Sequence, residues 1–177
     1  MTTIEKPPKL SDAQPSDLRR AMGRFLTGVG IVMTETEAGG PHGATINSLT
    51  WVSLEPPLVL VSLATTSRVA EDVRAAGAYS VSILGAHQQR IASAFARPGD
   101  GKFDGLEIHR GATGLPVAPG ALSTLECSVE REIEAGDHMI LLGRVHHAWH
   151  RAGEPLAFFS GRFGSFVDPD GELDIWL

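Results

Sequence analysis

An alternation of apolar and charged residues in the last third of the chain places the tightest limit on its fold. Over residues 125–134, apolar positions interrupted only by Arg131 alternate with Glu126, Ser128, Glu130, Glu132 and Glu134. A period of two is typical of a strand with one buried and one solvent-facing side. Residues 135–137, Ala-Gly-Asp, predict a turn, after which residues 138–151 return as a second strand. The chain therefore contains a long antiparallel hairpin, and we expect its glutamates to face solvent.

The rest of the chain predicts more strands and a few short helices. Residues 139–145 are apolar on both faces, so one face should meet a core and the other should be covered by a helix or a second subunit. Turn-bounded apolar segments predict strands over 29–36, 42–52, 58–64 and 79–84, with a last pair within 155–166. Helical spacing predicts helices over 16–26, 68–76 and 87–96, the first two capped by Ser16 and Ser67. Residues 97–119, rich in Gly and Pro, are interpreted as irregular with one short strand. The fold class is mainly β with short α-helices, a mostly antiparallel barrel.

Length and charge narrow the classes of protein that remain. A chain of 177 residues favours one domain, and we expect a flexible leader over 1–15, one domain over 16–167 and a C-terminal tail over 168–177. With 15 Lys and Arg against 21 Asp and Glu, the net charge is −6, which disfavours nucleic-acid binding. The apolar stretch 56–64 is too short to span a bilayer, and residues 1–14 lack the apolar run of a signal peptide. We expect a cytoplasmic protein that binds neither nucleic acid nor membrane.

Familiar catalytic patterns are missing from the sequence. It holds no G-x-G-x-x-G, no phosphate loop, no H-E-x-x-H and no G-x-S-x-G. His146 and His150 would lie about 13 Å apart on a strand, with His147 on the opposite face, so no metal site is predicted. The single cysteine, Cys127, is interpreted as a small buried hydrophobic residue.

Two groups of polar residues fit poorly with a plain core. The predicted strand over 42–52 carries Thr45, Asn47, Ser48 and Thr50, and a buried strand runs through Ser62 into Thr65, Thr66 and Ser67 at a helix start. A helix N-terminus flanked by hydroxyls can bind a phosphate, and Arg68 adds positive charge. Amide and hydroxyl groups nearby could bind a flat ring with polar edges. The pattern indicates a phosphorylated planar ligand such as a flavin; the alternative is that Ser67 only caps the helix and the hydroxyls only fill the sheet.

Several blocks of sequence resemble one enzyme family. These are residues 25–32 (FLTGVGIV), 43–60 (GATINSLTWVSLEPPLVL), 125–127 (LEC), 136–138 (GDH), 143–145 (GRV) and 158–163 (FFSGRF). Together they make the chain, from about residue 17 to 166, similar to the flavin reductases, the short-chain NAD(P)H:flavin oxidoreductases that serve two-component monooxygenases. Trp51 departs from the pattern, since that position is more often small, which puts neighbouring ligand contacts in question.

The resemblance implies a Greek-key split β-barrel of the FMN-binding type, usually a homodimer. It implies FMN or FAD as flavin, NADH or NADPH as co-substrate, and a separate flavin-dependent monooxygenase as partner. The matching cofactor-binding positions are Thr45, Ile46, Asn47, Ser48, Ser62, Leu63, Ala64, Ser67, Arg68, Phe95, Arg162 and Phe163. The matching histidine of the G-D-H block, His138, would lie on the nicotinamide side and act in catalysis, or could be purely structural. The alternatives are a flavin- or haem-binding barrel without reductase turnover, and a structural or interaction barrel with a degenerate pocket.

Overall fold

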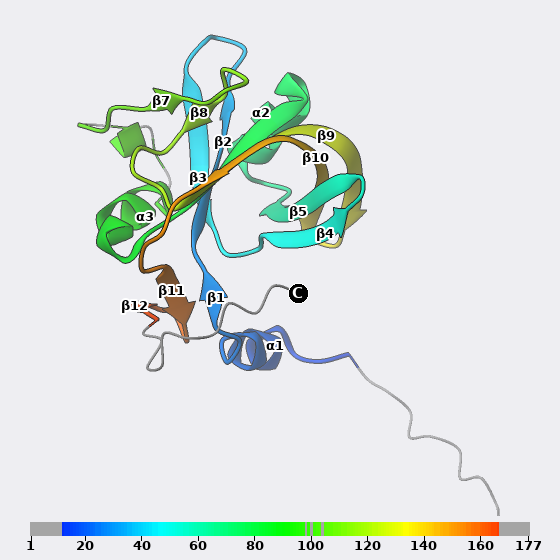
Figure 1. Ribbon diagram of the computed structural model, residues 1–177. Helices are drawn as coiled ribbons and strands as arrows, with labels where there is room; N and C mark the ends of the chain where they lie inside the picture. The colour runs from blue at the N-terminus through cyan, green and yellow to red at the C-terminus, as the bar shows by residue number, and fades with distance from the viewer. Residues whose placement is uncertain (1–11, 98, 100, 104, 167–177) are drawn as a thin grey trace, which may run out of the picture.

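A seven-stranded sheet dominates the computed structural model, which describes residues 12–97, 99, 101–103 and 105–166 (Figure 1). Its strands are β2 (Gly30–Glu35), β3 (Pro41–Ile46), β4 (Thr50–Leu54), β5 (Pro57–Ala64), β6 (Ala78–Ile83), β9 (Ser123–Ala135) and β10 (His138–His150). They lie in the order β3-β2-β6-β9-β10-β5-β4, and every neighbouring pair is antiparallel. The mainly β, antiparallel fold predicted from the sequence is confirmed.

The two edges of this sheet, β3 and β4, are consecutive in the chain and are joined by residues 47–49. The path from Ile46 to Thr50 can span at most about 14 Å, so the sheet curls until its edges come together. The ladders within residues 12–97 do not pair β3 with β4, and the barrel is therefore split at this junction. We call residues 47–49 the seam. The single strand expected over 42–52 was wrong, because the chain leaves one edge here and starts the opposite one.

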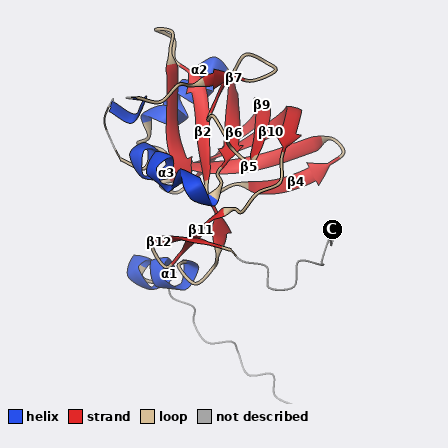
Figure 2. Cartoon of the chain, turned by 60° about the vertical axis from the view of Figure 1, so that its left-hand side comes forward, coloured by secondary structure: helices blue, strands red, loops and turns tan. Residues whose placement is uncertain are grey.

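A smaller sheet and a helix lie at one end of the barrel (Figures 1 and 2). The strands β1 (Thr27–Gly28), β11 (Leu156–Phe159) and β12 (Arg162–Ser165) pair in the order β1-β11-β12. Helix α1 (Pro15–Met22) precedes them and buries none of its residues. The expected helix over 16–26 was too long and its cap was misplaced: Pro15, whose fixed φ suits the first turn, follows the N-cap Gln14, and Gly23 ends the helix.

Two further helices cover the core of the barrel. Helix α2 (Arg68–Ala76) matches its predicted range, ends at Gly77 with φ 66°, and buries Val69, Ala70 and Val73. They join one hydrophobic cluster with Val61, Val81 and Leu141 of the sheet. The helix expected over 87–96 is a 3-10 turn (Ala86–Gln88) followed by α3 (Gln89–Phe95). Ala92 and Phe95 of α3 join a second cluster with Ile31, Met33 and Leu84.

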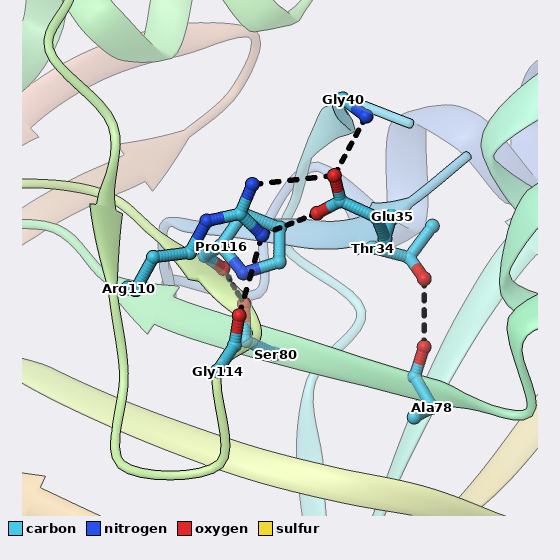
Figure 3. Close-up of polar contacts among 8 residues, drawn as sticks. All are labelled: Thr34, Glu35, Gly40, Ala78, Ser80, Arg110, Gly114 and Pro116. Atoms are coloured by element: carbon cyan, nitrogen blue, oxygen red, sulfur yellow. Dashed lines mark hydrogen bonds and ion pairs between the residues drawn. The ribbon is translucent and has the colours of Figure 1, made fainter. Parts of the chain in front are cut away.

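The irregular segment after α3 is held to the barrel by polar contacts. It contains a short 3-10 turn, η2 (Gly101–Phe103), and two paired strands, β7 (His109–Arg110) and β8 (Pro116–Val117), where one strand was expected. Arg110 pairs with Glu35 of β2, whose carboxylate also accepts from the Gly40 N–H at 2.6 Å (Figure 3). The buried Ser80 hydroxyl donates to the Pro116 carbonyl (Figure 3). Each of these contacts joins β7 or β8 and its loop to the sheet, or holds the β2–β3 turn.

Glu126 contradicts the expectation that the glutamates of β9 face solvent. Its side chain is 1% exposed, whereas Glu130, Glu132 and Glu134 are exposed. The carboxylate accepts from the Ala112 N–H at 2.8 Å, from the Thr113 N–H at 2.7 Å and from the Thr113 hydroxyl. The reason is that the 110–117 segment crosses over this end of β9 and supplies donors that the sequence pattern does not reveal.

The described part of the chain contains no helix that is both long enough and apolar enough to cross a membrane. The predicted leader over residues 1–15 and the predicted tail over 168–177 lie largely or wholly outside the described residues.

Candidate active site

The seam opens into a cavity of about 880 Å³. Ile46, Asn47, Ser48, Thr50 and Trp51 form one wall. The other lining residues are mainly apolar and come from the end of α1, the segment that joins α1 to β2, the seam and the sheet: Met22, Phe25, Leu26, Thr27, Gly28, Val29, Gly30, Leu49, Val59, Ile83 and Leu125. An apolar cavity of this size with a few polar groups on one side is typical of a small-molecule site.

A pair of hydrogen bonds ties the seam to the end of β5. The Ser48 hydroxyl donates to the Ser62 carbonyl at 2.8 Å and accepts from the Ser62 N–H at 3.1 Å. These bonds place Asn47 and Ser48 beside Ser62, Leu63 and Ala64, which the sequence predicted for the same site. Leu63 is 5% exposed and belongs to the core, so its backbone rather than its side chain can face a ligand.

His138 lies at the same end of the barrel, at the start of β10. The sheet register pairs it with Ala64 of β5. Its side chain is 46% exposed, and Nδ1 lies 2.8 Å from Oδ1 of Asp137. The hydrogen bond to His138, together with its charge, lowers the pKa of the Asp137 carboxyl below its ordinary value. The Asp137 carbonyl in turn accepts from the Thr65 N–H at 3.0 Å, so the turn before β10 is held against the residues that lead into α2.

Ser67 occupies the N-cap position of α2, as predicted, but its side chain makes no capping hydrogen bond. The backbone N–H of Ser67 donates to the Ala64 carbonyl at 2.9 Å, which keeps it next to the end of β5. Arg68 is exposed and lines a second cavity of about 380 Å³ between α2, the start of β3 and η2. The hydroxyl of Ser67 therefore keeps hydrogen-bonding capacity that an ordinary helix cap would use.

Three predicted residues lie apart from this group. Phe95 is 1% exposed, and its ring meets that of Phe103 edge-on at 4.9 Å, so it is a core residue beneath β3. Arg162 and Phe163 lie on β12 of the smaller sheet, where Phe163 packs against Phe158. None of the three lines either of the two cavities. Thr45, by contrast, is on β3 directly before the seam, and its hydroxyl donates to the Ala92 carbonyl at 2.7 Å.

The structure places Thr27 and Trp51 on the lining of the cavity, which the sequence did not predict. The Thr27 hydroxyl is the one side-chain oxygen or nitrogen buried without a hydrogen-bond partner in the described residues, and Thr27 lines the large cavity. Buried polar atoms usually have a partner, so this hydroxyl is available to a molecule that the chain does not itself provide. Trp51, 59% exposed, stands on the same wall as Asn47. The sequence around Thr27 carries no signal of this, because Thr27 pairs with Phe158 of β11, which is distant in the chain.

The chemistry of the donor set suits a flat ring with polar edges. The polar residues that line the cavity offer an amide and hydroxyls, and most of its other lining residues are apolar or aromatic. The described residues contain no cluster of three or more His, Cys, Asp or Glu that could hold a metal ion. Cys127 is buried, and burial raises the pKa of its thiol to about 12, so it does not supply a thiolate at neutral pH.

Comparison with known proteins gives consistent matches over most of the chain. Residues 22–166 match the family model described as flavin reductase like domain. An NADH-dependent flavin reductase from Rhodococcus sp. is 39% identical over 156 residues, covering 87% of this chain and 88% of that protein. The reductase component of a 4-nitrophenol 4-monooxygenase/4-nitrocatechol 2-monooxygenase from Rhodococcus opacus is 38% identical over 167 residues, covering 93% and 89%. Another relative is longer: the chain spans 42% of a probable flavin reductase from Rhizobium meliloti (strain 1021).

A solved structure agrees with the fold. The Streptomyces globisporus C-1027 NADH:FAD oxidoreductase SgcE6, in complex with NAD and FAD fragments, superposes with a TM-score of 0.83 at 38% identity. The match covers 92% of this chain and 100% of that one.

Proposed function

The chain belongs to the flavin reductase family, and from this premise we propose that it uses NADH to reduce FMN or FAD and supplies the reduced flavin to a partner monooxygenase. The observation that carries the proposal is the seam. Its polar residues are held by Ser48 and Ser62 beside a large cavity with one polar and one apolar wall. The relatives named above support NADH as donor and the role as a reductase component.

The residues of the chain are proposed to bind and orient rather than to react. Bound together, NADH and the flavin supply the chemistry themselves, the transfer of a hydride between two rings. Asn47 and the backbone of residues 62–64 would hold the polar edge of the flavin ring, and Ser67 with Arg68 would bind its phosphate. Such a site accelerates transfer through proximity and orientation. It needs no nucleophile, which agrees with a site whose polar groups are amides, hydroxyls and one histidine.

His138 is proposed to orient the nicotinamide. Asp137 accepts a hydrogen bond from Nδ1 and thereby fixes the ring, which directs Nε2 away from Asp137. With a half-exposed side chain next to Ala64, Nε2 can donate to or accept from a ligand at the end of β5. Phe95, Arg162 and Phe163 stay proposed contacts of lower rank, since the first is a core residue and the others lie on β12.

Steady-state oxidation of NADH and NADPH, measured with riboflavin, FMN and FAD side by side, tests the function. We expect turnover with NADH that depends on added flavin. Flavin binding without turnover would show a binding protein instead, and neither binding nor thermal stabilisation by flavin would show a degenerate pocket. For His138→Ala we expect KM for NADH to rise about tenfold, equivalent to about 1.4 kcal/mol, while His146→Ala on the same strand serves as control. An unchanged KM for NADH in His138→Ala would remove the residue from the site.

We also propose that two copies associate through α1 and β4. The apolar side chains of α1 and the residues after it are more than half uncovered, with Leu18 57%, Met22 59% and Phe25 67% exposed. Leu54 of β4 is 75% exposed. Exposed apolar side chains of this number and size usually mark an interface. Light scattering should give twice the mass of the chain, and Phe25→Glu should reduce it to that of one copy; a monomeric wild-type protein would refute the dimer.

A further inference from the structure

Trp51 lies on the inner face of the sheet but is not covered by the core. In the ladder between β4 and β5 it is directly opposite Val59, and directly opposite residues of an antiparallel pair have their side chains on the same face. Val59 is 7% exposed and belongs to the hydrophobic core of the barrel. Trp51 therefore faces the same way as a core residue, and yet it is 59% exposed.

The exposure of Trp51 follows from the place where the barrel is split. Its strand, β4, is an edge strand of the sheet (Figure 2). The cavity of about 880 Å³, which we call the seam cavity, is lined by both Trp51 and Val59. A bulge follows at once, because Ser53 is the next residue of β4 to pair with β5 and Val52 is extra. Bulges redirect side chains and interrupt regular pairing, so the indole is held on the inner face beside open space.

The indole ring has no partner within the described part of the chain. Four phenylalanine rings there pair with one another, Phe95 with Phe103 and Phe158 with Phe163. Trp51 makes no such ring contact, and its N–H forms no hydrogen bond within the same residues. A large aromatic side chain can bury roughly 150–250 Å². A ring left open beside a cavity can give that contact to a ligand.

The seam cavity also holds polar groups that would place a flavin ring against Trp51. Asn47 comes four residues before Trp51, which is at most about 14 Å along the chain, and both residues line the cavity. The buried Thr27 hydroxyl, which has no partner within the described residues, lines it too. A flavin ring held at its polar edge by Asn47, as proposed above, can therefore lie with one face against the indole.

We propose that Trp51 stacks on the flavin ring and makes the site bind oxidised flavin more tightly than reduced flavin. The proposal rests on the proposed function and deepens it. The oxidised ring is flat and electron-poor, which suits the electron-rich face of an indole. The reduced ring is electron-rich and bends about N5 and N10, so it loses both the flat contact and the electrostatic attraction. A reductase that supplies a partner enzyme must take up the first form and give up the second, and Trp51 provides that difference.

The test measures the binding of both forms of FMN to the full chain, with the reduced form titrated under anaerobic conditions. We expect Trp51→Leu to raise Kd for oxidised FMN about tenfold and to change Kd for reduced FMN by less than about twofold. The midpoint potential of bound FMN should then rise by about 30 mV, which is the equivalent of a tenfold change for a two-electron couple. Trp51→Phe keeps a ring and should restore most of the affinity for oxidised FMN.

A second readout depends on contact between the two rings. An indole stacked on a flavin quenches the flavin fluorescence, so the emission of bound FMN should be weak in the wild-type protein and rise several-fold in Trp51→Leu. The matched control is Trp149→Leu. Trp149 is 49% exposed, but it lies on β10 and does not line the seam cavity. This control should leave the emission and both Kd values unchanged.

The outcomes separate the proposal from the proposed function. If Trp51→Leu raises both Kd values equally, or changes neither, the proposal is overturned while the reductase assignment stands. If Trp51→Leu lowers the mass in solution to that of one copy and leaves the ratio of the two Kd values unchanged, Trp51 belongs to the contact between copies, and the proposal is again overturned. If the wild-type protein neither binds nor reduces any flavin, the proposed function fails and the proposal fails with it.

Discussion

The seam and the region around Glu126 are both rich in polar side chains, but they differ in how those side chains are satisfied. Around Glu126, each buried polar group bonds to the chain itself: the carboxylate has three donors, Ser80 donates to Pro116, and Ser82 accepts from the Ala118 N–H at 3.0 Å. Around the seam, Asn47 is exposed, the Ser67 hydroxyl makes no capping bond and the Thr27 hydroxyl has no partner in the described residues.

The difference separates polar groups that hold the fold from those that can hold a ligand. A buried polar group costs free energy unless it is hydrogen-bonded, so a folded chain satisfies nearly all of them. Near Glu126 the hydrogen-bonding groups are all used within the chain, and these bonds hold the irregular segment against the sheet. At the seam, Asn47 and Thr27 line the cavity with hydrogen-bonding groups that the chain does not use, and these groups are available for binding a ligand. Ser48 has both roles. Its hydroxyl forms hydrogen bonds within the chain, and these bonds position Asn47, which is exposed.

The largest effect should come from Glu126→Gln. Replacing one carboxylate oxygen by an amide NH₂ places a donor against the donors of Thr113 or Ala112, so we expect the free energy of unfolding to fall by about 3 kcal/mol. Glu134→Gln on the exposed part of the same strand should change it little. Urea unfolding at pH 7 measures both. Equal stabilities for the two variants would show that the bonds to the 110–117 segment contribute nothing.

The stability difference between wild type and Glu126→Gln should also depend on pH. Burial disfavours the charged form of Glu126, but hydrogen bonds from Thr113 and Ala112 outweigh it and lower the pKa of the carboxyl below its ordinary value of 4.5. A group with a lowered folded pKa stabilises the protein above its unfolded pKa, and that stabilisation disappears as pH falls through the folded value. The difference between wild type and Glu126→Gln should therefore be full at pH 7 and shrink below about pH 4.3.

A middle-sized effect should distinguish Ser48 from Ser67. Ser48→Ala removes both bonds to Ser62, so we expect a loss of about 1–2 kcal/mol in stability and a higher KM for flavin. Ser67→Ala removes a hydroxyl without a capping bond, so it should raise KM for flavin several-fold with little change in stability. Thermal unfolding and flavin kinetics on both variants give the answer. A Ser67→Ala protein as destabilised as Ser48→Ala would break the contrast drawn above.

The smallest effect should come from a pair at neither region. Arg74 Nε lies 2.7 Å from Glu132 Oε2, and the two side chains are 51% and 32% exposed. Exposed pairs contribute about 0–1 kcal/mol and are screened by salt. Glu132→Gln should shift stability by under about 0.5 kcal/mol, and the shift should vanish in 1 M NaCl. A larger shift that survives salt would place this pair among the contacts that hold the fold.

Much of the fold could be predicted because its signals are local. The hairpin of β9 and β10, the strand β5 and the helix α2 each carry a complete pattern within a dozen residues. The break at the seam could not be predicted, because the pattern over residues 42–52 is that of one continuous strand. The need to leave one sheet edge for the other arises only from the strand order. The burial of Glu126 was missed for the same reason: its donors come from residues 13 and 14 positions away, in a segment without regular structure.

The candidate site divides in a similar way. The family resemblance predicted residues 45–48, 62–64, 67–68 and 138 as site residues, and their role in binding stays a prediction. Hydrogen bonds and strand register place Ser48 beside Ser62, and Ser67 and His138 beside Ala64. The buried, unpartnered hydroxyl of Thr27 was not foreseen, since Thr27 pairs with Phe158 of β11, which is distant in the sequence.

By itself, the sequence determined which segments form strands and which family the chain joins, and it predicted a group of polar residues as a flavin site. These depend on side-chain periodicity and on short blocks that act locally. The tertiary structure alone decided which polar groups keep unused hydrogen-bonding capacity. Whether a hydroxyl or carboxylate finds a partner depends on what the closing of the barrel and the crossing of the 97–119 segment place beside it.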